Sequence, residues 1–207
     1  MKHILRIVVV LALACAAMAT FANIALAQKI DIAFGMSTIV APSASACGSC
    51  DGNPFVAQSL TGGAYPGFSG DVTFWHNLGF GAEVFWRGTT SDNYLQTQFG
   101  PGINFRPVFY NFNAVYAPKL TNHVSLELVG GIGALDTHFS QTSVFGNSGV
   151  LSTSSHLDGD FGGGLKLYLI HGFFVRPEAR VYVINNNTNY SANHATRVGA
   201  SIGYTFR

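Results

Sequence analysis

Large apolar residues alternate regularly with small or charged ones along most of this chain, and this alternation allows few folds. The clearest example covers residues 29–40, where large apolar side chains hold most even positions and Lys, Asp, Ala, Gly and Ser hold most odd ones. A period of two is typical of β-strands with two different faces. The same alternation occurs in seven further segments, at residues 66–76, 78–87, 106–117, 124–135, 157–169, 173–183 and 196–207. The sequence therefore predicts eight strands of ten to thirteen residues, and about 9–11 residues suffice for a tilted strand to cross a bilayer.

The connections between these segments alternate between short and long. Short ones are expected near Asn77, at 118–123 and at 170–172, and long ones at 41–65, 88–105, 136–156 and 184–195. Short turns at one end and long loops at the other are typical of outer-membrane barrels, whose turns face the periplasm. The pattern predicts an all-β fold, an eight-stranded antiparallel up-and-down transmembrane β-barrel. The start of the fourth strand is open, because residues 95–105 could extend it beyond the membrane.

The placement of charge predicts which face of the sheet meets lipid. Every charged residue of the eight segments has the parity opposite to the apolar stripe, except Arg106 at a strand end. A charge on the lipid face near the midplane costs ~2–4 kcal/mol, so the apolar face is expected outward and the charged, glycine-rich face inward. Five aromatic residues break the pattern, because their parity is inward: Trp75, Phe85, Phe109, Phe174 and Tyr182. A soluble lipocalin-like barrel with the faces reversed is the alternative.

The expected inner face carries seven charges of each sign. They are Lys29, Arg87, Lys166, Arg176, Arg180, Arg197 and Arg207, and Asp31, Asp71, Glu83, Glu127, Asp158, Asp160 and Glu178. An ion-selective pore tends to have rings of one sign, whereas buried charges of both signs can pair with one another. Because eight strands leave an interior that side chains just fill, we expect a barrel plugged by paired charges. A narrow porin-like channel is the alternative.

Composition and the first 27 residues indicate that the chain is exported. Charged residues make up 10%, against about 25% in soluble domains, and no basic run suggests nucleic acid. Residues 1–27 are expected to be a cleaved signal peptide, because an apolar run at 7–19, too short to span a bilayer, precedes a small-residue cleavage site at Ala25-Leu26-Ala27. An uncleaved anchor or a lipoprotein at Cys15 are alternatives. Residues 28–207 are then one barrel domain.

The last segment carries a resemblance to a known family. It reads Arg197-Val-Gly-Ala-Ser-Ile-Gly-Tyr204-Thr-Phe206-Arg207 and resembles the closing strand of outer-membrane proteins. With the leader and the eight strands, the mature chain resembles the OmpA/OmpX-like family of small outer-membrane barrels. Residues 106–118 and 174–180 also resemble outer-membrane barrel proteins of this type from acidobacteria.

This resemblance implies a location in the cell outer membrane and contact with its lipids and lipopolysaccharide. It also implies that Tyr204 and Phe206 form a C-terminal signal for the barrel-assembly machinery. The family includes anchors, adhesins and resistance factors, so the fold does not imply one activity. We expect a structural or surface-interaction role, in which the loops bind any extracellular ligand.

One local motif has chemical content. Cys47-Gly-Ser-Cys50 lies in the first long loop and is expected to form a disulfide. Free thiols, or a redox or metal function, are alternatives, although a zinc site would need further ligands. We expect no cofactor.

Some members of the resembled family modify lipid A with a His-x-Ser pair and an acidic partner. His123-Val-Ser125 with Glu127 has that spacing, but it lies beside a predicted periplasmic turn, in the wrong leaflet. His194-Ala-Thr196 is near the outer rim and lacks the serine. We therefore expect no catalytic and no metal site, with a lipid A-modifying enzyme as an alternative.

Overall fold

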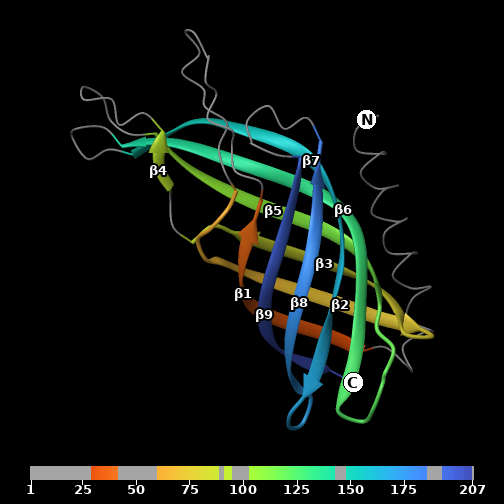
Figure 1. Ribbon diagram of the computed structural model, residues 1–207. Coiled ribbons are helices and arrows are strands. Elements are labelled where there is room, and N and C mark those ends of the chain that lie inside the picture. Colours follow the sequence, from red (N-terminus) through yellow and green to blue (C-terminus); the bar gives the residue numbers. More distant parts are fainter. Residues whose placement is uncertain are drawn as a thin grey trace, which may run out of the picture.

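Nine strands form one antiparallel sheet that closes on itself (Figure 1). The structure is a computed structural model that describes residues 29–41, 60–88, 91–94, 103–142, 148–185 and 193–206. Its strands are β1 (Lys29–Val40), β2 (Tyr65–Trp75), β3 (Leu78–Trp86), β4 (Ser91–Tyr94), β5 (Ile103–Tyr116), β6 (Val124–Thr142), β7 (Ser148–Tyr168), β8 (Phe173–Ile184) and β9 (His194–Phe206).

Eight of these strands make the wall, in the order β3-β2-β1-β9-β8-β7-β6-β5, and pairing between β3 and β5 closes the ring. The short β4 pairs only with the start of β5, at Phe105 and Ile103. The predicted eight-stranded antiparallel barrel is thereby confirmed. Among the described residues, no helix is long and apolar enough to cross a membrane.

One predicted loop is wrong. Residues 136–156 were expected to be a long connection, yet β6 continues to Thr142 and β7 already begins at Ser148. The two strands pair along this whole stretch, with a register shift after Phe139. The reason is that polar cross-strand pairs hold this ribbon, for example Ser155 Oγ donating to Asp136 Oδ1. Because large apolar residues do not alternate regularly in this stretch, the period-two signal used to find strands is missing.

The barrel has a turn end and a loop end. At the turn end, short connections join β2 to β3, β5 to β6 and β7 to β8, and β1 begins beside the end of β9. Backbone hydrogen bonds link each turn to its neighbour. They run from Ala117 N to Asn77 O (2.8 Å), from Tyr168 N to His123 O (2.8 Å) and from Thr205 N to Gly172 O (2.9 Å). The opposite end, where the long connections begin, is the loop end.

The outward face of the wall is apolar. Phe112 is 72% exposed, Ile132 67% and Phe80 66%, and every wall strand contributes exposed apolar side chains. A band of this kind lies against lipid in membrane barrels. Trp75 also lies outward, 61% exposed, so its predicted inward position is wrong. A register shift between Thr73 and Trp75 turns this last residue of β2 to the other face.

The other four aromatic residues with inward parity are buried, and three of them form a cap at the loop end. The rings of Phe85 and Phe109 stack with centroids 4.5 Å apart, and Tyr182 packs against both. We call the whole group the aromatic cap, which consists of Ile39, Leu60, Tyr65, Phe85, Phe109, Leu135, Tyr182, Ile184 and Ala195. It occupies the loop-end part of the interior, and most of the buried charged residues lie between it and the turn end.

Candidate functional site

Twelve of the fourteen inward charges predicted from the sequence lie inside the barrel. Ten of them are 1–7% exposed: Asp31, Asp71, Glu83, Arg87, Glu127, Asp160, Lys166, Arg176, Arg180 and Arg197. The side chain of Glu178 is 10% exposed, and Asp158 is 2% exposed. Lys29 is half-buried at the start of β1, and Arg207 lies outside the described residues. The strand alternation brings these groups to one face, and closure of the sheet brings them together.

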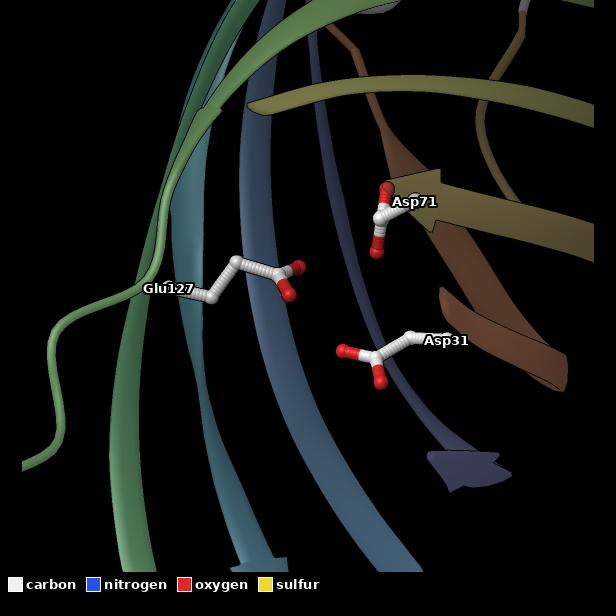
Figure 2. Close-up of side chains that lie close together, drawn as sticks. All are labelled: Asp31, Asp71 and Glu127. Carbon is white, nitrogen blue, oxygen red and sulfur yellow. The ribbon is translucent and has the colours of Figure 1, made fainter. Parts of the chain in front are cut away.

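Near the turn end, Lys166 lies among three carboxylates, a group that we call the lysine cluster. Asp31, Asp71 and Glu127 come from β1, β2 and β6 and point toward one another (Figure 2). Lys166 Nζ lies 2.5 Å from Asp31 Oδ2 and 3.6 Å from Asp71 Oδ2, and it also pairs with Glu127 Oε2. Since like charges at such range repel, the ammonium group of Lys166, together with the guanidinium of Arg176, offsets the repulsion among the three carboxylates.

The three carboxylates also offer the donor set of a hard-cation site. One oxygen from each lies within 4.8 Å of the others, and oxygen ligands of this kind suit Ca²⁺ or Mg²⁺. The ammonium of Lys166 already contacts all three groups. A metal ion would have to displace it, so the arrangement is that of an internal ion pair.

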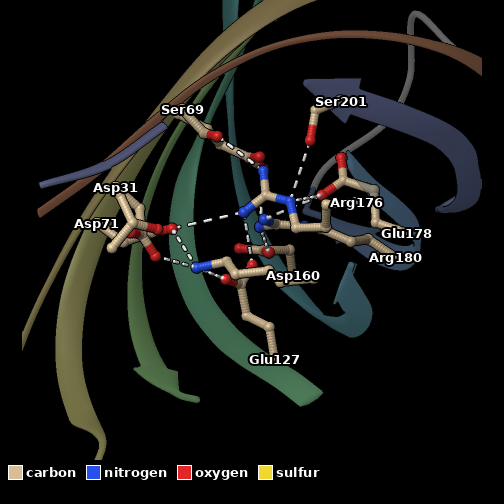
Figure 3. Close-up of polar contacts among 12 residues, drawn as sticks. Asp31, Ser69, Asp71, Glu127, Asp160, Arg176, Glu178, Arg180 and Ser201 are labelled. Carbon is tan, nitrogen blue, oxygen red and sulfur yellow. Dashed lines mark hydrogen bonds and ion pairs between the residues drawn. The ribbon is translucent and has the colours of Figure 1, made fainter. Parts of the chain in front are cut away.

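Arg176 of β8 connects the lysine cluster to the rest of the interior (Figure 3). Its Nη1 donates to Glu127 Oε1 at 2.6 Å, and its Nη2 donates to Ser69 Oγ at 2.7 Å. Its Nε lies 3.1 Å from Ser201 Oγ and 3.2 Å from Glu178 Oε2. With all three nitrogens engaged, the guanidinium ties β8 to β2, β6 and β9.

A second group, the arginine cluster, lies closer to the cap and consists of Arg180, Arg197, Glu83, Glu178 and Asp160. Glu83 accepts from Arg180 Nη1 at 3.0 Å and from Arg197 Nη2 at 2.9 Å. Arg180 Nη1 also reaches Asp160 Oδ2 at 3.2 Å, and Arg197 Nη2 reaches Glu178 Oε1 at 2.9 Å. In the ring order, β8 and β3 lie on opposite sides. The pair between Arg180 and Glu83 therefore crosses the whole interior.

The arginine cluster and the aromatic cap touch directly. Tyr182 of the cap donates its hydroxyl to Glu83 Oε1 at 3.0 Å. The guanidinium carbon of Arg197 lies 4.2 Å from the centroid of Phe85, a cation–π contact. Arg87 lies apart from both clusters, at the loop end. Its Nη2 donates to the carbonyl oxygens of Thr61 and Gly62.

Sequence reasoning missed the neutral members of the network, among them two asparagines of β5. Asn111 Nδ2 of β5 donates to Asp158 Oδ1 at 2.5 Å and to Asp160 Oδ1 at 3.3 Å. With its amide oriented to suit its neighbours, Asn113 donates to Asp160 Oδ1 and accepts from Arg180 Nη1. Charge was the signal used to find inward polar residues, and the inward positions of this segment carry none. Two amides at inward positions beside a charged lumen were the available signal.

Little empty space is left in this part of the interior. A cavity of about 20 Å³ lies beside Ser37, Ser69, Glu178, Arg197 and Ser201. A volume of about 10–15 Å³ is enough for one water molecule. The cavity thus has room for about one water among polar groups, which is far from a continuous aqueous path.

The residues with the spacing of a lipid A-modifying pair do not share a surface. His123 is exposed on the turn between β5 and β6, whereas Ser125 is 3% exposed inside the barrel. The Ser125 hydroxyl donates to Pro118 O at 2.9 Å, and Glu127 belongs to the lysine cluster. Thr196 lies in β9 beside His194. Cys47 and Cys50 lie outside the described residues, so their predicted disulfide stays a prediction.

No protein-family model matches the chain, and no curated protein matches it in sequence. Among solved structures, a major outer membrane protein from Thermus thermophilus is similar with a TM-score of 0.61 and 11% identity, over 87% of this chain and 100% of that one. Neisserial surface protein A is similar with a TM-score of 0.53 and 15% identity, over 86% and 97%. Ail of Yersinia pestis, in complex with the heparin analogue sucrose octasulfate, has a TM-score of 0.52 and 17% identity, also over 86% and 97%.

The chain has the fold of the small outer-membrane β-barrels. At these identities the likeness concerns the fold alone.

Proposed function

We propose that this protein is a structural or surface-interaction barrel of the cell outer membrane, of the OmpA/OmpX-like kind, whose interior is closed by paired charges. The observation that carries this proposal is the network of ion pairs between opposite walls, above all Arg180 of β8 with Glu83 of β3. The apolar band around the wall and the similarity in fold to outer-membrane barrels support the location.

The interior suits a plug better than a pore for a physical reason. Charges of both signs alternate across the interior and satisfy one another, whereas a selective pore presents one sign to a passing ion. Breaking one partner of a buried pair leaves an uncompensated charge and costs about 3–5 kcal/mol. An ion that entered would have to break several such pairs in turn and then pass the aromatic cap. A narrow porin-like channel is therefore the second candidate.

The loop end is where a surface interaction would take place. There β6 and β7 continue well past the end of β8, and β4 adds a short strand beside β5 (Figure 1). Ail, a barrel of similar fold, has been seen with a heparin analogue. For this chain we propose that the loop end binds any extracellular ligand, and that lipids and lipopolysaccharide surround the wall.

Further expectations belong to the same proposal. The first 27 residues are a cleaved signal peptide, Tyr204 and Phe206 at the end of β9 are read by the barrel-assembly machinery, and the protein has no catalytic activity. Lipid A from cells with and without the gene tests the last point. Loss of one acyl chain in the presence of the gene would favour the lipid A-modifying enzyme.

Membrane fractionation combined with a heat-modifiability gel tests the location and the fold together. A folded barrel resists detergent and should migrate differently before and after boiling, in the outer-membrane fraction. Recovery of the protein from the soluble periplasm would refute the membrane location and favour the soluble lipocalin-like barrel.

Planar-bilayer recording on the folded protein tests the closed interior. We expect no stepwise openings from protein that shows the heat-dependent gel shift. Reproducible single-channel steps from such protein would refute the closed interior and favour the narrow porin-like channel.

A further inference from the structure

Arg106 is the exception among the strand charges, because its parity places it on the lipid-facing side of the wall. It is exposed near the loop end of β5, and among the residues that the structure describes none forms an ion pair with it. The register places His138 of β6 directly beside it, and Thr153 of β7 beside His138. These three side chains form one outward-facing row, which we call the rim row.

The rim row is partly ordered by its own contacts. Thr153 Oγ1 lies 3.3 Å from His138 Nδ1, within hydrogen-bond distance. This contact fixes the imidazole ring through one nitrogen, so Nε2 is the nitrogen left for a ligand. Arg106 extends from the neighbouring strand with its donors available.

The rim row lies just beyond the level of the lipid headgroups, within reach of the Arg106 side chain. Tyr110 and the 63%-exposed Leu157 belong to the apolar band and lie two rows closer to the turn end. Two rows are four residues along a strand, or about 13 Å, which a tilt of about 45° reduces to roughly 9 Å along the membrane normal. The polar layer of a bilayer is roughly 5–8 Å thick on each side. The long side chain of Arg106 covers the remaining distance.

One acidic group lies close to the rim row. Asp136 faces outward in the row between Arg106 and the apolar band, and the Ser155 hydroxyl donates to its Oδ1. Its charge opposes an anion in its own row, whereas Arg106 and His138 offer donors to an anion in the rim row.

We propose that Arg106, His138 and Thr153 form a binding site for the phosphate group of an outer-leaflet lipid. A guanidinium presents a planar fork of donors that matches a phosphate, and an imidazole and a hydroxyl add further donors. The proposal rests on the outer-membrane location proposed above, and it names the lipid group that one face of the wall binds. It differs from general lipid contact, because it predicts a preference for phosphorylated lipid that depends on one arginine.

The test measures binding of fluorescent diphosphoryl lipid A to the full mature protein in phosphatidylcholine nanodiscs. An attraction of about 1 kcal/mol per basic residue near a charged surface corresponds to about a fivefold change in affinity. We expect Arg106→Gln to weaken binding by about fivefold and Asp136→Asn to strengthen it. Lys119→Gln removes the same charge from a position at the turn end and should leave the affinity unchanged. Lipid A without phosphate should compete poorly.

Each other outcome has a defined meaning. If Arg106→Gln binds as the wild type does, or loses no more than Lys119→Gln, the site is refuted. If excess inorganic phosphate displaces the lipid completely, the site binds a free anion and the lipid assignment is wrong. The heat-dependent gel shift is recorded on every sample. Protein that fails to enter the nanodisc as a folded barrel refutes the proposed function itself, which separates that failure from the failure of the site.

Discussion

Lys166 Nζ lies 2.5 Å from Asp31 Oδ2, although 135 residues separate the two in the chain. The contact joins β7 to β1, which do not pair in the sheet. The same ammonium pairs with Asp71 and Glu127. One cation therefore holds three strands of the wall against a fourth.

Replacing this lysine with methionine is expected to destabilise the barrel strongly. Lys166→Met keeps much of the volume and removes the charge, which leaves three carboxylates close together, so we expect a loss of about 3–5 kcal/mol in the free energy of unfolding. Urea unfolding in lipid vesicles, followed by the fluorescence of the two tryptophans, measures this loss. Lys119→Met, at a turn position outside the barrel interior, is the control. Equal urea midpoints of unfolding for the two variants would mean that the lysine cluster contributes little to the stability of the barrel.

Opening the barrel to ions should require changes in both layers of the interior. Arg180→Ala removes the pair that crosses the arginine cluster, but the aromatic cap still blocks the loop end. Phe109→Ala removes a stacked ring of the cap, but the charged layer remains. We expect conductance only from the double variant, measured in planar bilayers. Openings from either single variant would show that one layer alone forms the seal.

Two adjacent glycines of β6 should differ sharply in their tolerance of alanine. A methyl group at Gly131 would overlap the carbonyl oxygen of Phe112 and the side chain of Asn113, whereas one at Gly130 would lie 3.8 Å from its nearest neighbour, the carbonyl oxygen of Asp160. We expect Gly131→Ala to lower the yield of heat-modifiable barrel in refolding, and Gly130→Ala to leave it unchanged. Equal yields would argue that the strands can move apart enough to admit a side chain.

The two cysteines of the mature chain are expected to be oxidised. Cys47 and Cys50 form an even pair after removal of the leader, and exported proteins meet an oxidising compartment. Unreduced, denatured protein should therefore take up no alkylating reagent, and reduced protein should take up two equivalents. Two equivalents without reductant would show free thiols.

The wall of the barrel was predictable because one face of each strand meets lipid and the other faces the interior. Apolar residues therefore recur at every second position of these strands. The bounds of β1 follow directly from residues 29–40, and the strand count follows from eight such segments. The extension of β6 and β7 past the apolar band was not predictable in this way, since its sequence lacks a regular alternation of large apolar residues. Trp75 shows the other limit. A register shift after Thr73 places Trp75, the last residue of β2, on the face opposite to the one that its parity predicts.

The members of the charged interior were also predictable, but their pairing was not. Parity alone places Glu83, Arg180 and Arg197 on one face, because each alternates with apolar neighbours. Which cation meets which carboxylate depends on the stagger and curvature of the closed sheet, and these are properties of all the strands together. Asn111 and Asn113 were not predicted, because the inward polar residues were identified by charge and an amide is neutral.

The pairing of β1 with β9 joins the first strand of the domain to the last, with Ile30 opposite Phe206. Until β9 is present, both edges of the sheet carry unpaired backbone groups, and a bilayer does not tolerate such edges. A partial barrel is therefore not stable in the membrane. The N-terminal strands must remain unfolded until the C-terminal strand is available. A truncation that removes only β9 should yield protein for the periplasmic proteases and no shorter barrel.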